Sequence, residues 1–293
     1  MSADADRIRA LPCWNGAIDI APLSGGLSNT NYCVADANGK HVVRFGIEYP
    51  FHHVARQREL MVARAAADAG FAPKIEYAEA GVMVTAFLVA KTYDQADVRA
   101  NALRIGALLK NFHQVMPHCV TGAGFMFWVF HVIRDYAKTL HAIDNVFVER
   151  LVAEANAMEA VQSPLPIIFG HNDLLPGNFL DDGNKLWLID FEYAGFNTAM
   201  FDLAGAASNA SMSQVQAEQL MQSYFAGSAS AELIKSFDAM QCASLIRETM
   251  WAMVSKLHLN APGVDYVAYT AENLARYELA LESYQSRYGK LKT

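Results

Sequence analysis

The sequence of 293 residues lacks several patterns that mark common classes of protein. Its four cysteines are scattered, with no Cys-x-x-Cys pair and no histidine pair beside them. They therefore indicate neither a zinc site nor a disulfide framework, and are typical of reduced thiols in a cytosolic protein. Lysine and arginine do not cluster and the net charge is −7, which argues against nucleic acid as a partner.

Long apolar runs are also missing. The longest apolar stretch, around residues 125–129, is interrupted at His131 and is too short to span a bilayer. The first residues are charged and do not resemble a signal peptide. With 53% hydrophobic and 18% charged residues, the composition is typical of a globular chain with a sizeable core. We expect a cytoplasmic protein without a membrane partner, whose oligomeric state the sequence does not define.

The most informative stretch covers residues 167–193, IIFGHNDLLPGNFLDDGNKLWLIDFEY. An apolar run at its start predicts a buried strand that leads into a polar loop over residues 171–178. Asp182-Gly183 is typical of a type I′ hairpin turn. Residues 178–180 and 185–189 are therefore expected to pair as short strands.

Four oxygen-bearing side chains are expected to converge around this hairpin: Asp173, Asn178, Asp190 and Glu192. Such ligands suit a hard cation such as Mg²⁺. The spacing His-x-Asp-x4-Asn, followed by Asp-Phe, is that of the protein-kinase catalytic loop and metal-binding aspartate. An alternative interpretation is a polar loop whose Asp and Asn only cap turns. Because that alternative leaves the second acidic pair unexplained, we predict a phosphotransferase site.

The N-terminal part predicts a small antiparallel sheet with one helix. Strand-like segments flank the Gly25-Gly26 and Asn38-Gly39 turns, a helical pattern covers 53–68, and strand-like runs cover 74–78 and 82–88. The order strand, strand, strand, helix, strand, strand is that of a kinase N-lobe. We expect an α+β, protein-kinase-like fold of two lobes.

Arg44 ends the third expected strand, and Glu59 lies in the middle of the expected helix. In a kinase N-lobe, Arg44 would face the nucleotide phosphates and pair with Glu59; the alternative is a surface ion pair, which stabilises little. The Gly25-Gly26 loop would lie over the phosphates. A glycine pair without GxGxxG or a Walker lysine is, however, equally typical of an ordinary hairpin.

The lobe boundary is expected at the strand-to-helix connection near residues 87–91, which would contact adenine, with Thr85 and Phe87 beside the nucleotide. The lobes are then 1–88, which binds ATP, and 89–293, which carries catalysis and the acceptor. Helical patterns in the second lobe cover residues 98–113, 128–143, 146–161, 199–207, 214–227, 230–259 and 264–288.

The segment after Asp190 is short. Only six residues separate Asp190 from Asn197, and helix resumes by about residue 200. A protein kinase needs a longer segment there to dock a peptide. We therefore expect the acceptor to be a small molecule.

Several segments resemble the choline/ethanolamine kinase family, which belongs to the aminoglycoside-phosphotransferase-like group. The resemblance covers roughly residues 20–280. The segments are SGGLSN at 24–29, LLKNFHQVMP at 108–117, GHNDLLPGNFL at 170–180, LIDFEYAGFNTAMFDLA at 188–204, ETMWAMVSKLH at 248–258 and VDYVAYTAENLARY at 264–277.

The resemblance implies ATP and Mg²⁺ as cofactors and assigns roles around them. Asp173 would take the proton of the acceptor hydroxyl with an unperturbed pKa, and His171 would orient the loop. Asn178 and Asp190 would ligate Mg²⁺, with Glu192 beside the ion. The phosphate loop would consist of Gly25, Gly26, Leu27, Ser28 and Asn29, with Arg44 on the phosphates. Asp202 would brace the catalytic loop, or alternatively cap a helix.

The resemblance also implies an acceptor pocket lined by Trp251 and Tyr269, whose rings attract an ammonium through cation–π interactions. Alternatively, both are core residues. Glu248 stands where eukaryotic members carry a second Trp, and Asn209 where they carry a Glu. If Glu248 faces the pocket, its carboxylate would accept from a primary ammonium and favour ethanolamine; the alternative is that it points to solvent.

The prediction is therefore a kinase that phosphorylates the hydroxyl of choline or ethanolamine. Alternatives are a kinase of thiamine, an aminoglycoside or an amino sugar, and a nucleotide-binding pseudokinase. The joint presence of Asp173, Asn178 and Asp190 argues against a pseudokinase.

Overall fold

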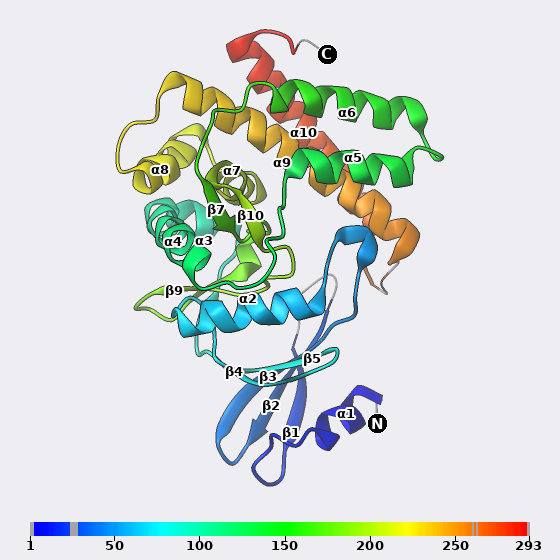
Figure 1. The fold of residues 1–293 in the computed structure, drawn as a ribbon, viewed down its shortest axis with the longest axis vertical. Helices are drawn as coiled ribbons and strands as arrows, with labels where there is room; N and C mark the ends of the chain where they lie inside the picture. The colour runs from blue at the N-terminus through cyan, green and yellow to red at the C-terminus, as the bar shows by residue number, and fades with distance from the viewer. Residues whose placement is uncertain (1–2, 24–28, 260, 262, 292–293) are drawn as a thin grey trace.

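The computed structural model describes residues 3–23, 29–259, 261 and 263–291, and it confirms a two-lobe α+β fold (Figure 1). A five-stranded antiparallel sheet forms the smaller lobe, and helices form most of the larger one. Helix α2 (Arg56–Asp68) lies between the sheet and the helices of the larger lobe (Figure 1). The position of the lobe boundary at residue 88 stays a prediction.

The five strands have the order β1-β2-β3-β5-β4, and neighbouring strands run antiparallel. The expected succession of three strands, a helix and two strands is confirmed. The helix ends where Gly70 adopts φ +80°, a conformation that glycine adopts without strain. The strands are β1 (Asp19–Leu23), β2 (Thr30–Asp36), β3 (Gly39–Phe45), β4 (Ile75–Glu79) and β5 (Val82–Ala86).

The sheet has two different faces because side chains alternate along each strand. Val43 and Val84 are buried in one apolar cluster with Ile8 of α1 (Ala3–Ala10). Their neighbours Arg44 and Thr85 therefore point to the opposite face, where they line a cavity. The strand pattern thus directs the one arginine of β3 toward the site.

The central stretch forms a strand, a loop and a hairpin, as expected. The hairpin turn is not of type I′, because within it only Gly183 has positive φ and a type I′ turn needs two such residues. Instead, a longer loop over residues 182–185 is closed by the Asp182 carboxylate, which accepts from the backbone N–H groups of Asn184 and Lys185. The strands of this stretch are β7 (Ile167–Gly170), β8 (Phe179–Asp181) and β9 (Leu186–Leu188), and β6 (Lys91–Thr92) pairs with β8 from outside it.

The short connection after Asp190 contains a strand that the sequence pattern did not predict. β10 (Gly195–Thr198) pairs antiparallel with β7, with Gly195 opposite Gly170. A Cβ on Gly195 would lie 2.8 Å from the carbonyl oxygen of Phe125. Glycine is therefore required for this close approach, which places the start of the next helix beside the catalytic loop.

The larger lobe is built around α9 (Ala231–His258), which is buried along most of its length and contacts α5, α6, α7 and α10. None of the described helices is long and apolar enough to cross a membrane. The other helices are α3 (Gln95–Ala100), α4 (Ala102–Val115), α5 (Val129–Leu140), α6 (Asn145–Glu159), α7 (Ala199–Asn209), α8 (Gln214–Phe225) and α10 (Tyr266–Tyr288), with short 3₁₀ segments η1 (Pro50–His52), η2 (Met116–His118) and η3 (Pro176–Asn178).

The crossing of α4 and α8 gives a test of the packing. A Cβ on Gly106 would lie 2.5 Å from the carbonyl oxygen of Leu220, whereas a Cβ on Gly205 of α7 meets only the Ser244 hydroxyl at 3.8 Å. We expect Gly106→Ala to lower the free energy of unfolding by about 2 kcal/mol through overpacking. Gly205→Ala, the matched control, should leave it unchanged or raise it by up to about 1 kcal/mol. Urea unfolding measures both; equal stability of the two variants would contradict the close crossing.

Candidate active site

The loop after β7 is held in place by one buried carboxylate. Asp202 of α7 accepts from the backbone N–H groups of His171 and Asn172, both at 2.7 Å, and from Nε2 of His113 at 2.8 Å. Burial alone would raise the pKa of Asp202, but these hydrogen bonds outweigh it and the pKa is lowered. The cap of α7 is Thr198, so the brace is confirmed and the helix-cap alternative is wrong.

Asp173 lies in this loop with its side chain 10% exposed. Burial raises its pKa well above the usual value, Arg247 opposes this, and the Glu248 carboxylate adds to it. The expectation of an unperturbed pKa was therefore wrong, because the sequence does not reveal burial. The raised pKa makes Asp173 a stronger base than an exposed aspartate once it is ionised.

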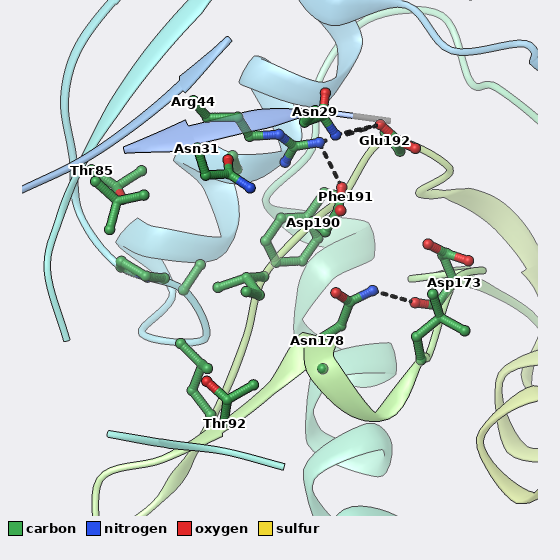
Figure 2. A pocket seen from close by; sticks show the side chains of 18 of the residues that line it. Asn29, Asn31, Arg44, Thr85, Thr92, Asp173, Asn178, Asp190, Phe191 and Glu192 are labelled. Carbon is green, nitrogen blue, oxygen red and sulfur yellow. Dashed lines mark hydrogen bonds and ion pairs between the residues drawn. The ribbon is translucent and has the colours of Figure 1, made fainter. Parts of the chain in front are cut away.

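Asn178 and Asp190 are placed on either side of the short hairpin (Figure 2). Asn178 ends η3, and its Nδ2 donates to the backbone oxygen of Asp173 at 2.8 Å. Asp190 follows β9 and has φ +68°, in the left-handed region that is costly for residues other than glycine. Strain of this kind persists where the surroundings impose it, and it is frequent at functional sites.

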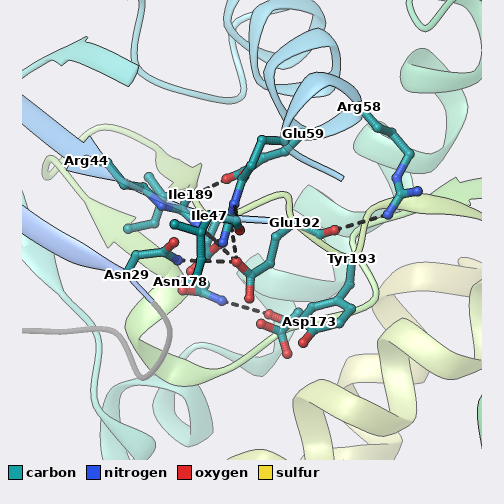
Figure 3. A network of polar contacts seen from close by, with 12 residues as sticks. Asn29, Arg44, Ile47, Arg58, Glu59, Asp173, Asn178, Ile189, Glu192 and Tyr193 are labelled. Carbon is teal, nitrogen blue, oxygen red and sulfur yellow. Dashed lines mark hydrogen bonds and ion pairs between the residues drawn. The ribbon is translucent and has the colours of Figure 1, made fainter. Parts of the chain in front are cut away.

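Arg44 contacts three carboxylates, one from α2 of its own lobe and two from the larger lobe (Figures 2 and 3). Its Nη1 lies 2.7 Å from Oε1 of Glu59, and its Nη2 lies 2.7 Å from Oδ1 of Asp190 and 3.2 Å from Oε2 of Glu192. The Arg44 side chain is 12% exposed. Burial alone would lower its pKa, but the carboxylates raise it, so the charge is permanent. The expected pair of Arg44 and Glu59 is confirmed as a buried contact and not a surface one.

A second arginine joins this cluster. Nη1 of Arg56 lies 2.6 Å from Oε2 of Glu59 and 2.9 Å from Oε2 of Glu192. The sequence interpretation missed it, although the i,i+3 spacing of Arg56 and Glu59 is typical of an ion pair on a helix. Glu192 also accepts from Nδ2 of Asn29 at 3.2 Å, so two guanidinium groups and an amide surround its carboxylate.

The far end of the site lies on α9 and α10. Trp251 donates through Nε1 to the Tyr193 hydroxyl at 2.9 Å, and its ring lies 5.8 Å from that of Tyr269. Glu248 is 5% exposed, so the alternative that it points to solvent is wrong. Its Oε2 accepts from the Tyr269 hydroxyl at 3.1 Å, and its Oε1 lies 2.5 Å from Nη1 of Arg247.

One cavity of about 480 Å³ extends from Arg44 and Asp190 to Trp251 and Tyr269. Of the residues that the sequence predicted, its lining includes Asn29, Arg44, Thr85, Phe87, Asp173, Asn178, Asp190, Glu192, Glu248, Trp251 and Tyr269. Glu59 is buried behind Arg44. His171 is fully buried, and its Nε2 donates to the carbonyl oxygen of Ile189 at 2.9 Å, which links the loop to the segment of Asp190. Gly25, Gly26, Leu27 and Ser28 lie outside the described residues.

Arg247 was also missed by the sequence interpretation. It lines the cavity between Asp173 and Glu248. The available signal was a charged residue directly before Glu248 in an otherwise uncharged helical run, SLIRETMW.

The model of the phosphotransferase enzyme family matches residues 19–234. The chain belongs to this family. The match includes the sheet, the catalytic loop and Asp190, whereas Arg247, Trp251 and Tyr269 lie beyond it. The predicted phosphotransferase is therefore confirmed at the level of the family.

Individual relatives are more specific. A curated "Probable ethanolamine kinase" of Arabidopsis thaliana is 30% identical over 203 residues, which are 62% of this phosphotransferase and 53% of the relative. The chain thus spans about half the length of that relative. A solved choline/ethanolamine kinase family protein from Mesorhizobium loti is 27% identical, with a TM-score of 0.78 over 96% of this chain and 95% of the other. Choline kinase LicA from Streptococcus pneumoniae has a TM-score of 0.76 at 22% identity, covering 97% of this chain and 98% of the other. These structures confirm the protein-kinase-like fold.

The brace of the catalytic loop is testable by Asp202→Asn. The amide of Asn accepts from only one of the two backbone N–H groups, and its own NH₂ opposes the other. We expect the free energy of unfolding at neutral pH to fall by about 3 kcal/mol, the scale of a lost buried hydrogen bond to a charged group. Urea unfolding measures it. Asp144→Asn, at the N-cap of α6, is the control and should be near neutral because Asn caps as well as Asp.

The difference in the free energy of unfolding between wild type and Asp202→Asn should depend on pH. Folding lowers the pKa of Asp202, so its contribution is complete above the unfolded pKa of about 3.9 and is lost as the pH falls below it. The stability difference between wild type and Asp202→Asn should therefore shrink in acid. A difference that stays constant down to the acid limit of folding would contradict an ionised Asp202.

Proposed function

We propose that this phosphotransferase moves the γ-phosphoryl group of ATP to the hydroxyl of a small amino alcohol, ethanolamine or choline. The observation that carries the proposal is the single cavity lined by Arg44 and Asp190 at one end and by Trp251 and Tyr269 at the other. Asp173 contacts residues of both ends, through its backbone oxygen to Asn178 and through its carboxylate to Arg247. A donor phosphate and an acceptor hydroxyl that share this cavity would meet beside Asp173.

The nucleotide end suits a polyphosphate. Arg44 supplies a permanent positive charge and is oriented by Glu59, which is itself held by Arg56. We propose that Thr85 and Phe87 contact the base and that Asn29, with the residues 25–28 before it, follows the phosphates. Glu192 is engaged by Arg44 and Arg56, so we assign it to supporting Arg44 beside the metal site.

Asn178 and Asp190 fit a Mg²⁺ ion that arrives with ATP. Asn178 donates through Nδ2 to Asp173, and Asp190 accepts from Arg44 through Oδ1. Oδ1 of Asn178 and Oδ2 of Asp190 are therefore the side-chain oxygens that could ligate a metal beside the cavity. The described residues contain no group of three His, Cys, Asp or Glu side chains suited to a metal. Mg²⁺ needs none, because it takes one or two protein ligands together with phosphate oxygens. Bound there, it would neutralise charge on the transferred group.

Asp173 acts in this proposal as the group that orients the acceptor hydroxyl and takes its proton. Phosphoryl transfer passes through a loose transition state, so positioning and charge neutralisation supply most of the catalysis. His171 stays buried beneath the loop and fixes its geometry through Ile189. We assign it an orienting role and not proton transfer.

The acceptor end suits an ammonium. The rings of Trp251 and Tyr269 attract a cation, and the buried Glu248 adds a carboxylate. Ethanolamine has N–H donors for that carboxylate, whereas choline has none. The names of the relatives from Arabidopsis thaliana and Mesorhizobium loti support the same class of acceptor. We propose that the nucleotide-binding lobe covers residues 1–88 and that the acceptor-binding lobe covers residues 89–293. We further propose that the enzyme is cytoplasmic and needs no nucleic acid.

An acceptor screen tests the function directly. ADP release should depend on ethanolamine or choline and not on thiamine or kanamycin. We expect the ratio of kcat/KM for ethanolamine to that for choline to be roughly tenfold higher in wild type than in Glu248→Trp, because choline lacks about 1–2 kcal/mol of cation–π contact with a second Trp. Coupled spectrophotometric assays at saturating ATP provide the measurement. Turnover with thiamine or kanamycin alone would refute the amino-alcohol assignment.

The role of Asp173 is tested by Asp173→Asn, which keeps the shape of the side chain and removes its charge. We expect kcat to fall by about 10²–10⁴-fold, the range for loss of a general base, while ATP affinity stays within a few-fold. Asp182→Asn in the exposed hairpin loop is the control and should retain wild-type turnover. Activity of Asp173→Asn within a few-fold of wild type would contradict its assignment.

A further inference from the structure

Arg247 is a buried cation at the acceptor end of the cavity. Its side chain is 2% exposed. Nη1 lies 2.5 Å from Oε1 of Glu248 and 3.7 Å from Oδ1 of Asp173, so one guanidinium nitrogen faces both carboxylates. The guanidinium carbon also lies 4.5 Å from the ring centroid of Tyr193 and 5.8 Å from that of Phe127. Two aromatic rings and two carboxylates therefore define its position.

The burial of Arg247 lowers the stability of the fold. Nε and Nη2 of Arg247 are buried and have no hydrogen-bond partner among the residues that the structure describes. An unsatisfied donor of a buried charged group costs stability, and a buried ion pair is often no more stabilising than apolar side chains of similar volume. Stabilisation of the fold therefore does not account for an arginine at this position.

The charges at the acceptor end give a reason. Asp173 and Glu248 carry two negative charges when ionised, and Arg247 carries one positive charge, which leaves a net charge of −1. Glu248 is further fixed by the Tyr269 hydroxyl, which donates to its Oε2. One ammonium group in the cavity would complete the balance, whereas a second would be left without a counter-charge.

We propose that Arg247 is a positioning and specificity-determining residue, which holds the carboxylates of Glu248 and Asp173 in place and limits the acceptor to one positive charge. The identity of the acceptor in this inference rests on the proposed function; the charge pairing itself does not. Without Arg247, two carboxylates lie buried without a counter-ion, and the pocket attracts a doubly charged acceptor. Arg247 acts through these carboxylates and not on the phosphoryl group.

A thermal unfolding cycle tests the pairing without any acceptor. In the wild type, Glu248→Gln removes one partner of a buried pair and should lower Tm. In the Arg247→Met background the same change removes an uncompensated buried charge and should raise Tm. A change of Tm with the same sign in both backgrounds would mean that Arg247 only fills space, and it would overturn the proposal.

Steady-state kinetics test the effect on the acceptor. Arg247→Met should lower kcat/KM for ethanolamine at least tenfold while KM for ATP stays within twofold, and Arg247→Lys, which keeps the charge, should recover part of the loss. Arg150→Met is the matched control, because Arg150 also pairs with a carboxylate, Glu278, and lies over an aromatic ring, Phe147, but on the exposed surface of α6. It should leave all constants within twofold. Equal losses in Arg247→Lys and Arg247→Met would contradict a role for the charge.

The last measurement is the charge preference. We expect the ratio of kcat/KM for 2-(2-aminoethylamino)ethanol to that for ethanolamine, measured below neutral pH so that both amines of this diamine are protonated, to rise at least fivefold in Arg247→Met. An unchanged ratio would overturn the specificity role. If the wild type phosphorylates neither ethanolamine nor choline, the proposed function fails. The unfolding cycle still decides the charge pairing in that case. If Arg247→Met does not fold, Arg247→Gln, which also removes the charge and keeps a polar side chain, takes its place in both experiments.

Discussion

The two lobes are held in register by a cluster of arginines and carboxylates centred on Arg44. Arg44 of β3 contacts Glu59 of α2 and both Asp190 and Glu192 of the segment that follows β9 (Figures 2 and 3). Buried charges persist only when they are paired, so each carboxylate limits where the other segments can lie. The sheet, the central helix and the proposed metal-binding aspartate are thereby positioned by the same electrostatic requirement.

The acceptor end repeats this arrangement with Arg247 between Asp173 and Glu248. Asp202 fixes the loop that carries Asp173, because it accepts from the backbone N–H groups of this loop and is itself held by His113 of α4. Apart from Glu248, whose ionic partner is the adjacent Arg247, each carboxylate named here has a partner that comes from a distant part of the chain. Such a site is preorganised, which is what phosphoryl transfer needs when most of the catalysis is positioning.

Some elements of the fold were predicted correctly from the sequence, and others were not. The long helices were predicted within a few residues because apolar periodicity over many residues is a strong local signal. β10 was missed because Gly195–Thr198 is short and becomes a strand only by pairing with β7. The Asp182-Gly183 dipeptide suggested a two-residue turn, whereas hydrogen bonds from Asn184 and Lys185 to the Asp182 carboxylate stabilise a longer loop.

The sequence by itself determined the order of strands and helix in the smaller lobe and the extent of the long helices, and it pointed to Asp173, Asn178 and Asp190 as site residues, because periodicity and motif spacing are properties of neighbouring residues. Only the tertiary structure decided that Glu248 is buried, that Asp173 has a raised pKa, and that Arg56 and Arg247 belong to the site. The physical reason is that burial and charge pairing depend on distances between segments far apart in the chain. Spacing along the sequence carries no information about those distances.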